Sequence, residues 1–174
     1  MQSEVIQRGS YRLVPASVSD VPEIVKHLSI ESARELKLLG YSSVKEGIEE
    51  MVSSAECYIA RRDGCVYSCV GGLFHGHKDD DPQMFAMFSG NIRDNFIPIA
   101  RGSKTLVKLF DKFHPRMTMT ILSEHEAMLN WALWLGFEVV STMNDTNNHE
   151  YINFVRCNPS MKDAYSGESR PVMH

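Results

Sequence analysis

The chain has 174 residues, a net charge of −4 and a sequence pI near 6.0. Its 43% hydrophobic and 23% charged residues are ordinary for a globular protein and exclude a disordered, collagen-like or coiled-coil chain. The negative charge excludes a global positive field that would attract nucleic acid or anionic lipid, and no run of 18 apolar residues or apolar signal-peptide core is found. We therefore expect a globular chain of ordinary one-domain length that stays in the cytoplasm.

The first third of the chain predicts a strand followed by three helices. A strand-like run at residues 11–15 precedes small polar residues that suit a helix start. Ser43 and Glu46 have the spacing of a capping box. Apolar residues keep helical spacing over three stretches, at residues 21–28, 33–39 and 43–54.

The middle of the chain predicts a β hairpin. Asp63-Gly64 lies between strand-like runs at residues 57–62 and 66–73, and this dipeptide is a strong hairpin signal. The polar stretch 75–82 predicts an exposed loop before a further strand at residues 83–89.

The last part of the chain alternates helical and strand-like patterns. Ser103 suits a helix start, and Gly136 suits the position just past a helix end. The patterns predict helices at residues 103–113 and 124–135, and strands at residues 117–122, 137–143 and 151–156. The element order predicts an α/β fold with a mixed central sheet of about six to seven strands and helices on both faces. We expect an N-terminal extension at residues 1–10, the domain at 11–156 and a loose tail at 157–174.

We interpret most of the cysteine, histidine and tryptophan residues as structural and not as functional. We expect the four cysteines to be reduced core thiols: Cys57, Cys65, Cys69 and Cys157. His75 and His77 lie beside three aspartates, at residues 79–81, in a stretch that is typical of a solvated loop, and we expect no metal there. Trp131 is expected in the core, whereas an exposed Trp134 would indicate a partner surface.

One helix-to-strand junction resembles a known family. The helix predicted at residues 124–135 runs into Leu135-Gly136-Phe137, and GNAT acetyltransferases commonly end the corresponding helix in Gly-Phe. The hairpin, the preceding helix and the closing strand pair also fall in the GNAT order. The resemblance covers roughly Tyr11 to Arg156 and implies an acetyltransferase fold that binds acetyl-CoA.

The resemblance places a cofactor site between a strand end and a helix start. It implies that acetyl-CoA lies against the strand near Phe88 and Ser89 and that its pyrophosphate meets a glycine-rich loop. The corresponding stretch keeps one glycine between two cations and implies these binding residues: Arg101, Gly102, Ser103, Lys104 and Thr105. An ordinary capped helix with solvated charges is the alternative.

The catalytic residues that the resemblance implies are altered in this sequence. Counted back from Gly136, Ala132 stands where many GNAT enzymes carry the Tyr that protonates the leaving thiolate. His125 stands where they often carry Asn, and His125 and Glu126 are candidate catalytic residues by position.

Two functions remain open at this point. The first is acetyl transfer from acetyl-CoA to an amine. The second is a GNAT-like protein without catalysis, because the altered loop and helix are similar to those of GNAT-like internal virion or head-associated proteins of short-tailed bacteriophages. Such a protein would be made in the host cytoplasm and bind a virion or host protein.

Overall fold

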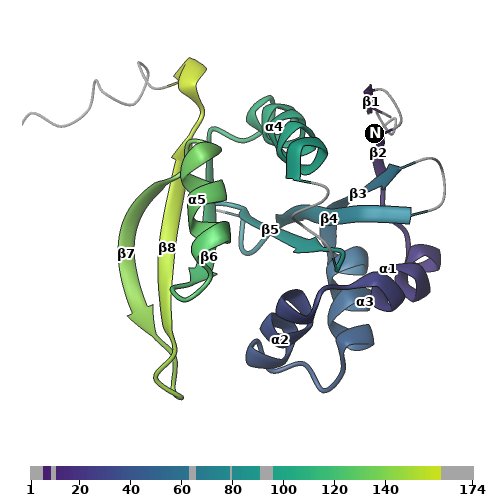
Figure 1. The fold of residues 1–174 in the computed structure, drawn as a ribbon. Coiled ribbons are helices and arrows are strands. Elements are labelled where there is room, and N and C mark those ends of the chain that lie inside the picture. Colours follow the sequence, from purple (N-terminus) through teal and green to yellow (C-terminus); the bar gives the residue numbers. More distant parts are fainter. Residues whose placement is uncertain (1–5, 9–10, 63–65, 79, 91–95, 162–174) are drawn as a thin grey trace, which may run out of the picture. The chain divides into compact units, whose positions relative to one another are not determined.

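Figure 1 shows the computed structural model, which describes residues 6–8, 11–62, 66–78, 80–90 and 96–161. These residues form eight strands and five α helices in an α/β arrangement. The chain divides into two compact units, Met1–Thr105 and Leu106–His174, each with its own strands and helices. No helix of the described ranges is long and apolar enough to span a bilayer.

The first unit contains a sheet whose strands follow the chain order β1-β2-β3-β4-β5. Each strand pairs antiparallel with the next. The predicted hairpin is confirmed, since β3 pairs with β4, although its Asp-Gly turn lies outside the described residues. The strands are β1 (Ile6–Arg8), β2 (Tyr11–Pro15), β3 (Ala55–Arg62), β4 (Val66–Phe74) and β5 (Gln83–Phe88).

Three helices of the first unit lie together on one face of this sheet (Figure 1). They are α1 (Val21–His27), α2 (Ile30–Leu38) and α3 (Val44–Ser54). α3 begins as predicted, because Ser43 Oγ accepts a hydrogen bond from the Glu46 N–H at 3.1 Å, but the Glu46 carboxylate turns to the Ser42 N–H at 3.0 Å. α2 starts earlier than predicted, because Ser29 Oγ caps it by accepting from the Ser32 N–H at 3.1 Å.

The hydrophobic core of the first unit forms between these helices and strands β3, β4 and β5. Apolar residues that recur every three or four positions along α1 and α3 face alternate residues of the strands. The buried cluster consists of Val21, Ile24, Leu36, Ile48, Met51, Val52, Cys57, Ile59, Val70 and Met87. This packing fixes the sheet against its helices and so positions the end of β5.

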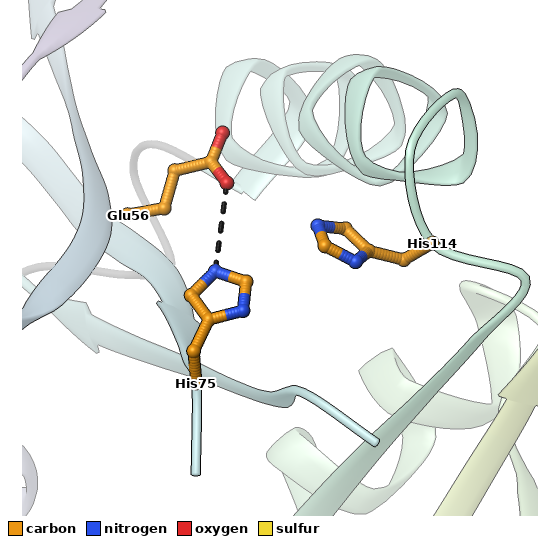
Figure 2. Close-up of side chains that lie close together, drawn as sticks. All are labelled: Glu56, His75 and His114. Atoms are coloured by element: carbon orange, nitrogen blue, oxygen red, sulfur yellow. Dashed lines mark ion pairs between the residues drawn. The ribbon is translucent and has the colours of Figure 1, made fainter. Parts of the chain in front are cut away.

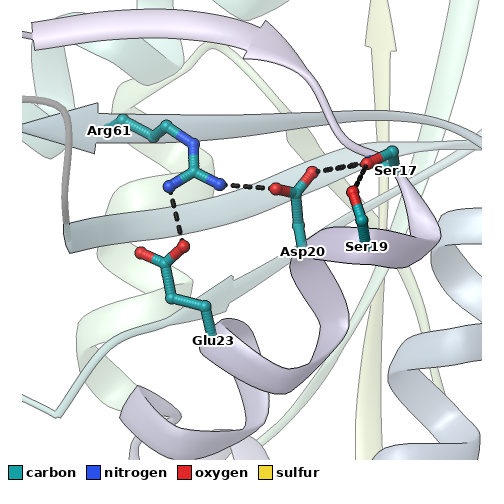
Figure 3. Close-up of polar contacts among 5 residues, drawn as sticks. All are labelled: Ser17, Ser19, Asp20, Glu23 and Arg61. Atoms are coloured by element: carbon teal, nitrogen blue, oxygen red, sulfur yellow. Dashed lines mark hydrogen bonds and ion pairs between the residues drawn. The ribbon is translucent and has the colours of Figure 1, made fainter.

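An ion-pair network joins the start of α1 to β3 (Figure 3). The guanidinium of Arg61 donates one hydrogen bond to the carboxylate of Asp20 and another, at 2.7 Å, to that of Glu23. Asp20 in turn accepts from the Ser17 N–H at 2.8 Å. All three charged side chains are about one quarter exposed or less, so the network is largely shielded from solvent.

The second unit contains a three-stranded sheet in the order β6-β8-β7, and both pairings are antiparallel. Its strands are β6 (Arg116–Leu122), β7 (Glu138–Asn144) and β8 (Glu150–Cys157), and its own helix is α5 (Glu126–Trp134). Gly136 ends α5 with a φ of +86°, and the next residue donates its N–H to Ala132 O at 3.1 Å. The predicted end of this helix at Gly136 is confirmed.

Arg156 on β8 ties together several elements of the second unit. It donates to the carboxylate of Asp111, at the end of α4 (Phe96–Asp111), with distances of 2.7 and 3.3 Å. Its Nη1 also donates to Leu135 O at 2.7 Å, where α5 ends. Because the side chain is mostly buried, these contacts anchor both helix ends to the strand.

The two ends of the predicted domain carry ordered structure beyond its expected bounds. Ile6–Arg8, predicted as part of an extension, form β1 against β2. At the other end the Asn158 N–H donates to Pro115 O at 2.9 Å, and a 3-10 turn follows at Pro159–Met161.

The structure describes two of the predicted core thiols and both tryptophans. Cys57 is a buried free thiol as predicted, but the prediction is wrong for Cys157, which is exposed at the end of β8. Cys65 and the side chain of Cys69 lie outside the described residues. Trp131 is buried as predicted, and Trp134 is about half exposed.

Candidate active site

The end of β5 is held by the connection between α1 and α2. The Phe88 N–H donates to Ser32 Oγ at 3.1 Å, and the Phe88 carbonyl accepts from the Ser29 N–H at 2.9 Å. One step further, the Gly90 N–H donates to His27 O at 3.0 Å. Phe88 and Ser89 are both buried. The strand end at which the sequence predicted the cofactor is therefore a fixed platform whose Phe88 main-chain groups are already hydrogen-bonded.

The predicted helix start at Ser103 is wrong. α4 begins at Phe96, so Ser103 and its neighbours lie inside a continuous helix. Ser103 Oγ donates to Ile99 O at 2.7 Å, which is a bond within the helix and not a cap. Pro98 permits the earlier start, because a proline in the first turn removes an N–H that has no helical partner anyway.

This correction changes how the predicted cofactor residues could act. The Thr105 hydroxyl donates to Arg101 O at 3.0 Å, and the backbone N–H groups of this turn belong to the helix. They cannot form the backbone cradle that a glycine-rich loop would supply. Arg101 and Lys104 are exposed and three residues apart, so they share one side of α4 as a pair of cations.

Gly102 lies between these cations without a steric requirement for glycine. A Cβ added there would meet no atom within 4 Å, and its φ is not in the left-handed region. The surroundings of Gly102 therefore leave room for a ligand but do not form a closed cradle.

The two candidate catalytic residues lie in the second unit. His125 is the N-cap of α5, and its carbonyl accepts from the N–H groups of Met128 and Leu129 at 2.9 and 3.0 Å. Glu126 is exposed in the first turn. Their catalytic role stays a prediction, and the predicted cofactor residues belong to the first unit.

Ala132, which replaces the Tyr of many GNAT enzymes, is completely buried in α5. A Tyr side chain at this position would overfill the packed interior of the second unit. The missing hydroxyl is therefore accompanied by packing that fits only a small residue.

Glu35 on α2 is a titratable residue that the sequence prediction missed. Burial raises the pKa of its carboxyl from 4.5 to about 7, so the group titrates near neutrality. Among the described residues, its carboxylate has no hydrogen-bond or ion-pair partner. No motif marks Glu35, and its burial follows from the packing of α2, so only the structure identifies it.

The loop after β4 places one predicted histidine beside a carboxylate. His75 Nε2 lies 3.7 Å from the Glu56 carboxylate, and His77 is exposed. Figure 2 shows the side chains of His75 and Glu56 turned toward each other. His114, also drawn there, belongs to the second unit.

The chain matches no protein-family model, and no curated protein matches it. Its fold, however, is found among solved structures. A protein from Bordetella pertussis assigned to the GnaT acetyltransferase family aligns over 88% of this chain and 99% of its own, with a TM-score of 0.68 and 13% identity. The ribosomal-protein-S5-alanine acetyltransferase from Vibrio fischeri aligns over 91% and 99%, with a TM-score of 0.69 and 11% identity.

The chain has the GNAT fold. The predicted fold class, α/β with a mixed central sheet and helices on both faces, is thereby confirmed. A further structure with the GNAT fold, the ribosomal L7/L12 alpha-N-protein acetyltransferase RimL in complex with coenzyme A, aligns over 88% of this chain and 98% of its own, with a TM-score of 0.67 and 13% identity. The structural matches show the GNAT fold; at identities this low they show nothing beyond the fold, so the chemistry must be argued from the residues.

Proposed function

We propose that the chain is an N-acetyltransferase that transfers acetyl from acetyl-CoA to an amine. The observation that carries the proposal is the GNAT fold over almost the whole chain, shared with acetyltransferases of which one is in complex with coenzyme A. The amino group of a protein is the acceptor class we favour, because two of those structures are named as ribosomal-protein acetyltransferases.

The residues of the first unit fit acetyl-CoA through side chains more than through the backbone. Arg101 and Lys104 would offset the charge of its phosphates from one side of α4. Phe88 and Ser89 would line the strand end, with the Phe88 main chain held by Ser29, the N-cap of α2, and by Ser32 within the helix. When bound, acetyl-CoA supplies an activated acetyl group, and the protein orients the amine toward it. His125 and Glu126 remain candidate catalytic residues.

The reduced state of the two described cysteines agrees with a cytoplasmic enzyme. Cys57 and Cys157 are both free, as is usual where thiols are kept reduced. We place the proposed activity in the cytoplasm on this ground.

The test is isothermal titration with acetyl-CoA and with CoA. We expect micromolar binding to the native chain and at least a tenfold loss in the double variant Arg101→Glu, Lys104→Glu, because reversing two charges repels the phosphates. The matched control, Arg12→Glu with Lys26→Glu, makes the same change in net charge at exposed positions on β2 and α1 and should bind normally. No binding to the native chain at millimolar acetyl-CoA would contradict the proposal.

The alternative is a GNAT-fold protein without catalysis. The continuous helix at Arg101–Thr105 and the buried Ala132 favour it, because both remove features on which the family's chemistry depends. The likeness to bacteriophage virion proteins belongs to this alternative. Failure of acetyl-CoA to bind in the titration above would support it.

A further inference from the structure

We propose that the second unit binds a second copy of this chain through β7, the edge strand of its sheet, so that two three-stranded sheets join across a two-fold axis. The inference concerns an interaction surface and is independent of the proposed acetyltransferase function. It assigns a partner to the surface that the half-exposed Trp134 indicates.

β7 is an unprotected edge strand. All seven of its residues are exposed, and among the described residues it pairs with β8 alone. An edge strand presents main-chain N–H and C=O groups that can pair with another chain, and proteins usually blunt such an edge by keeping it short or by placing charged residues or proline on it. β1 in the first unit shows this protection, because it has three residues and ends in Arg8. β7 is longer and contains no lysine, arginine or proline.

Apolar side chains gather around this edge. Of the eleven large hydrophobic residues that are exposed in the described part of the chain, five lie close together in sequence: Leu133, Trp134, Val139, Val140 and Met143. Val139 lies opposite Phe154 on β8. Phe154 shares a sheet face with Arg156, which donates to Leu135 O at the end of α5. Val139 is therefore on the face that carries α5, and an exposed apolar area of this kind is typical of an interaction site.

The charges of this surface favour a second copy as its occupant. From Leu129 to Asn144 the chain carries one charged side chain, Glu138, although 23% of all its residues are charged. Such a surface offers no complement to a strongly charged partner, but it can face an identical surface without repulsion. A two-fold axis across the edge pairs the two β7 strands antiparallel, so the two Glu138 carboxylates lie at opposite ends of the joined strands.

Two features of β7 limit where the strands can pair. An extra residue, Val140, interrupts the register with β8, and a bulge of this kind bends and twists its strand. We therefore expect main-chain pairing over residues 141–144 and side-chain packing over the rest. The carboxylate of Asp145, which follows β7, accepts the N–H groups of Asn147 at 2.8 Å and His149 at 2.9 Å. Its charge is thus engaged in the hairpin turn of its own copy.

Sedimentation equilibrium tests the association. We expect the native chain at micromolar concentration to have twice the chain mass of 19.7 kDa. The double variant Val139→Lys, Met143→Lys should associate at least tenfold more weakly, because lysines on both copies then repel each other across the axis. The matched control Ile30→Lys, Leu39→Lys makes the same change at exposed apolar positions at the two ends of α2 and should associate like the native chain.

A charge-swap experiment separates lost pairing from lost folding. Val139→Glu, Met143→Glu should also be monomeric alone. An equimolar mixture of the lysine and glutamate variants should form a one-to-one complex, because opposite charges then meet across the axis. In the native chain, amide hydrogens of residues 141–144 should exchange more slowly as the protein concentration rises, because pairing protects the edge.

Three results would overturn the proposal. The first is a native chain that stays monomeric at submillimolar concentration. The second is a native dimer whose lysine variant associates equally well, since the copies then meet elsewhere. The third is a mixture of the two charged variants that stays monomeric, since β7 then does not meet β7. Acetyl-CoA binding is a separate measurement, and its result leaves this proposal unchanged.

Discussion

Cys57 shows how burial suppresses the chemistry of a single side chain. Its thiol lies in the core of the first unit, and burial, with the negative charge of Asp20 as a second cause, raises its pKa to about 12. The thiolate is the reactive form of cysteine, so this thiol has almost none of it at ordinary pH. Cys157, by contrast, is exposed.

We therefore predict that iodoacetamide at pH 8 alkylates Cys157 and leaves Cys57 unmodified. Mass spectrometry of proteolytic peptides measures both sites. In 6 M guanidinium chloride the two cysteines should react alike, because unfolding removes the burial. Equal labelling of both in the native chain would contradict the burial of Cys57.

Gly102 yields a second prediction at the scale of a single residue. A glycine inside a helix costs roughly 0.5–1 kcal/mol relative to alanine, and a Cβ at Gly102 has no atom within 4 Å. Gly102→Ala should therefore raise the free energy of unfolding by that amount in a urea titration. Acetyl-CoA affinity should stay unchanged, because the backbone of this turn is committed to the helix. A loss of affinity with intact stability would show that a ligand needs the bare glycine.

At the scale of elements, Gly136 is where glycine is required. Its φ of +86° is unfavourable for other residues, and an added Cβ would lie 2.5 Å from Arg156 Nη1. We predict that Gly136→Ala lowers the free energy of unfolding by about 1–3 kcal/mol, because it strains the end of α5 and displaces the mostly buried arginine. Urea denaturation, with Gly102→Ala as the matched glycine control, measures this. A neutral effect would mean that Arg156 moves aside without cost.

The network around Arg61 gives a prediction about how β3 holds α1. Arg61→Met leaves Asp20 and Glu23 without their cation, and we expect a loss of about 2–3 kcal/mol in the free energy of unfolding. Lys45→Met, which breaks the exposed 3.5 Å pair with Glu49, should cost less than about 0.5 kcal/mol.

A triple variant tests whether the loss of stability in Arg61→Met comes from the unpaired carboxylates. Adding Asp20→Asn and Glu23→Gln to Arg61→Met should restore most of the lost stability, because no unpaired carboxylate then remains. If the triple variant is as unstable as the single one, the arginine stabilises the unit by packing and not by charge.

Local signals explain which elements could be predicted from the sequence. The hairpin pairing of β3 with β4, the Ser43 cap and the Gly136 helix end each depend on a few neighbouring residues, and the structure confirms all three. The predicted start of α4 was wrong. Ser103 suits a cap in isolation, but the buried Ile99 and Ala100 extend the apolar side of the helix upstream. Propensity alone could not decide between them.

The candidate site was less predictable than the fold. The sequence located the strand end at Phe88 and the cations of α4, but the contacts of Phe88 with Ser29 and Ser32 join residues more than fifty positions apart. Glu35 became visible only through its burial. Both depend on tertiary packing, for which the sequence carries no local signal.

For the molecule as a whole, Glu35 makes stability depend on pH. Its pKa is higher in the folded chain than in the unfolded chain, so between about pH 4.5 and 7 the native state holds a proton that the unfolded state has released. Stability from this group is therefore present at low pH, falls as pH rises through that window, and is lost above about pH 7.

We predict that Glu35→Gln is more stable than the native chain at pH 8 by up to roughly 3 kcal/mol and no more stable at pH 4.5. Urea denaturation at the two pH values measures the difference, with Glu31→Gln as the exposed control on α2. A gain of the same size at both pH values would show that the effect does not come from the carboxyl's ionisation.

The strand orders of the two units carry a consequence for the chain as it leaves the ribosome. In the first unit each strand pairs with the one made just before it, so the sheet can assemble progressively during synthesis. In the second unit the middle strand, β8, is the last to be made, and β6 and β7 both wait for it. Arg156 arrives on that same strand, so nearly all of the described chain must emerge before either the sheet or the clamp of the second unit can close.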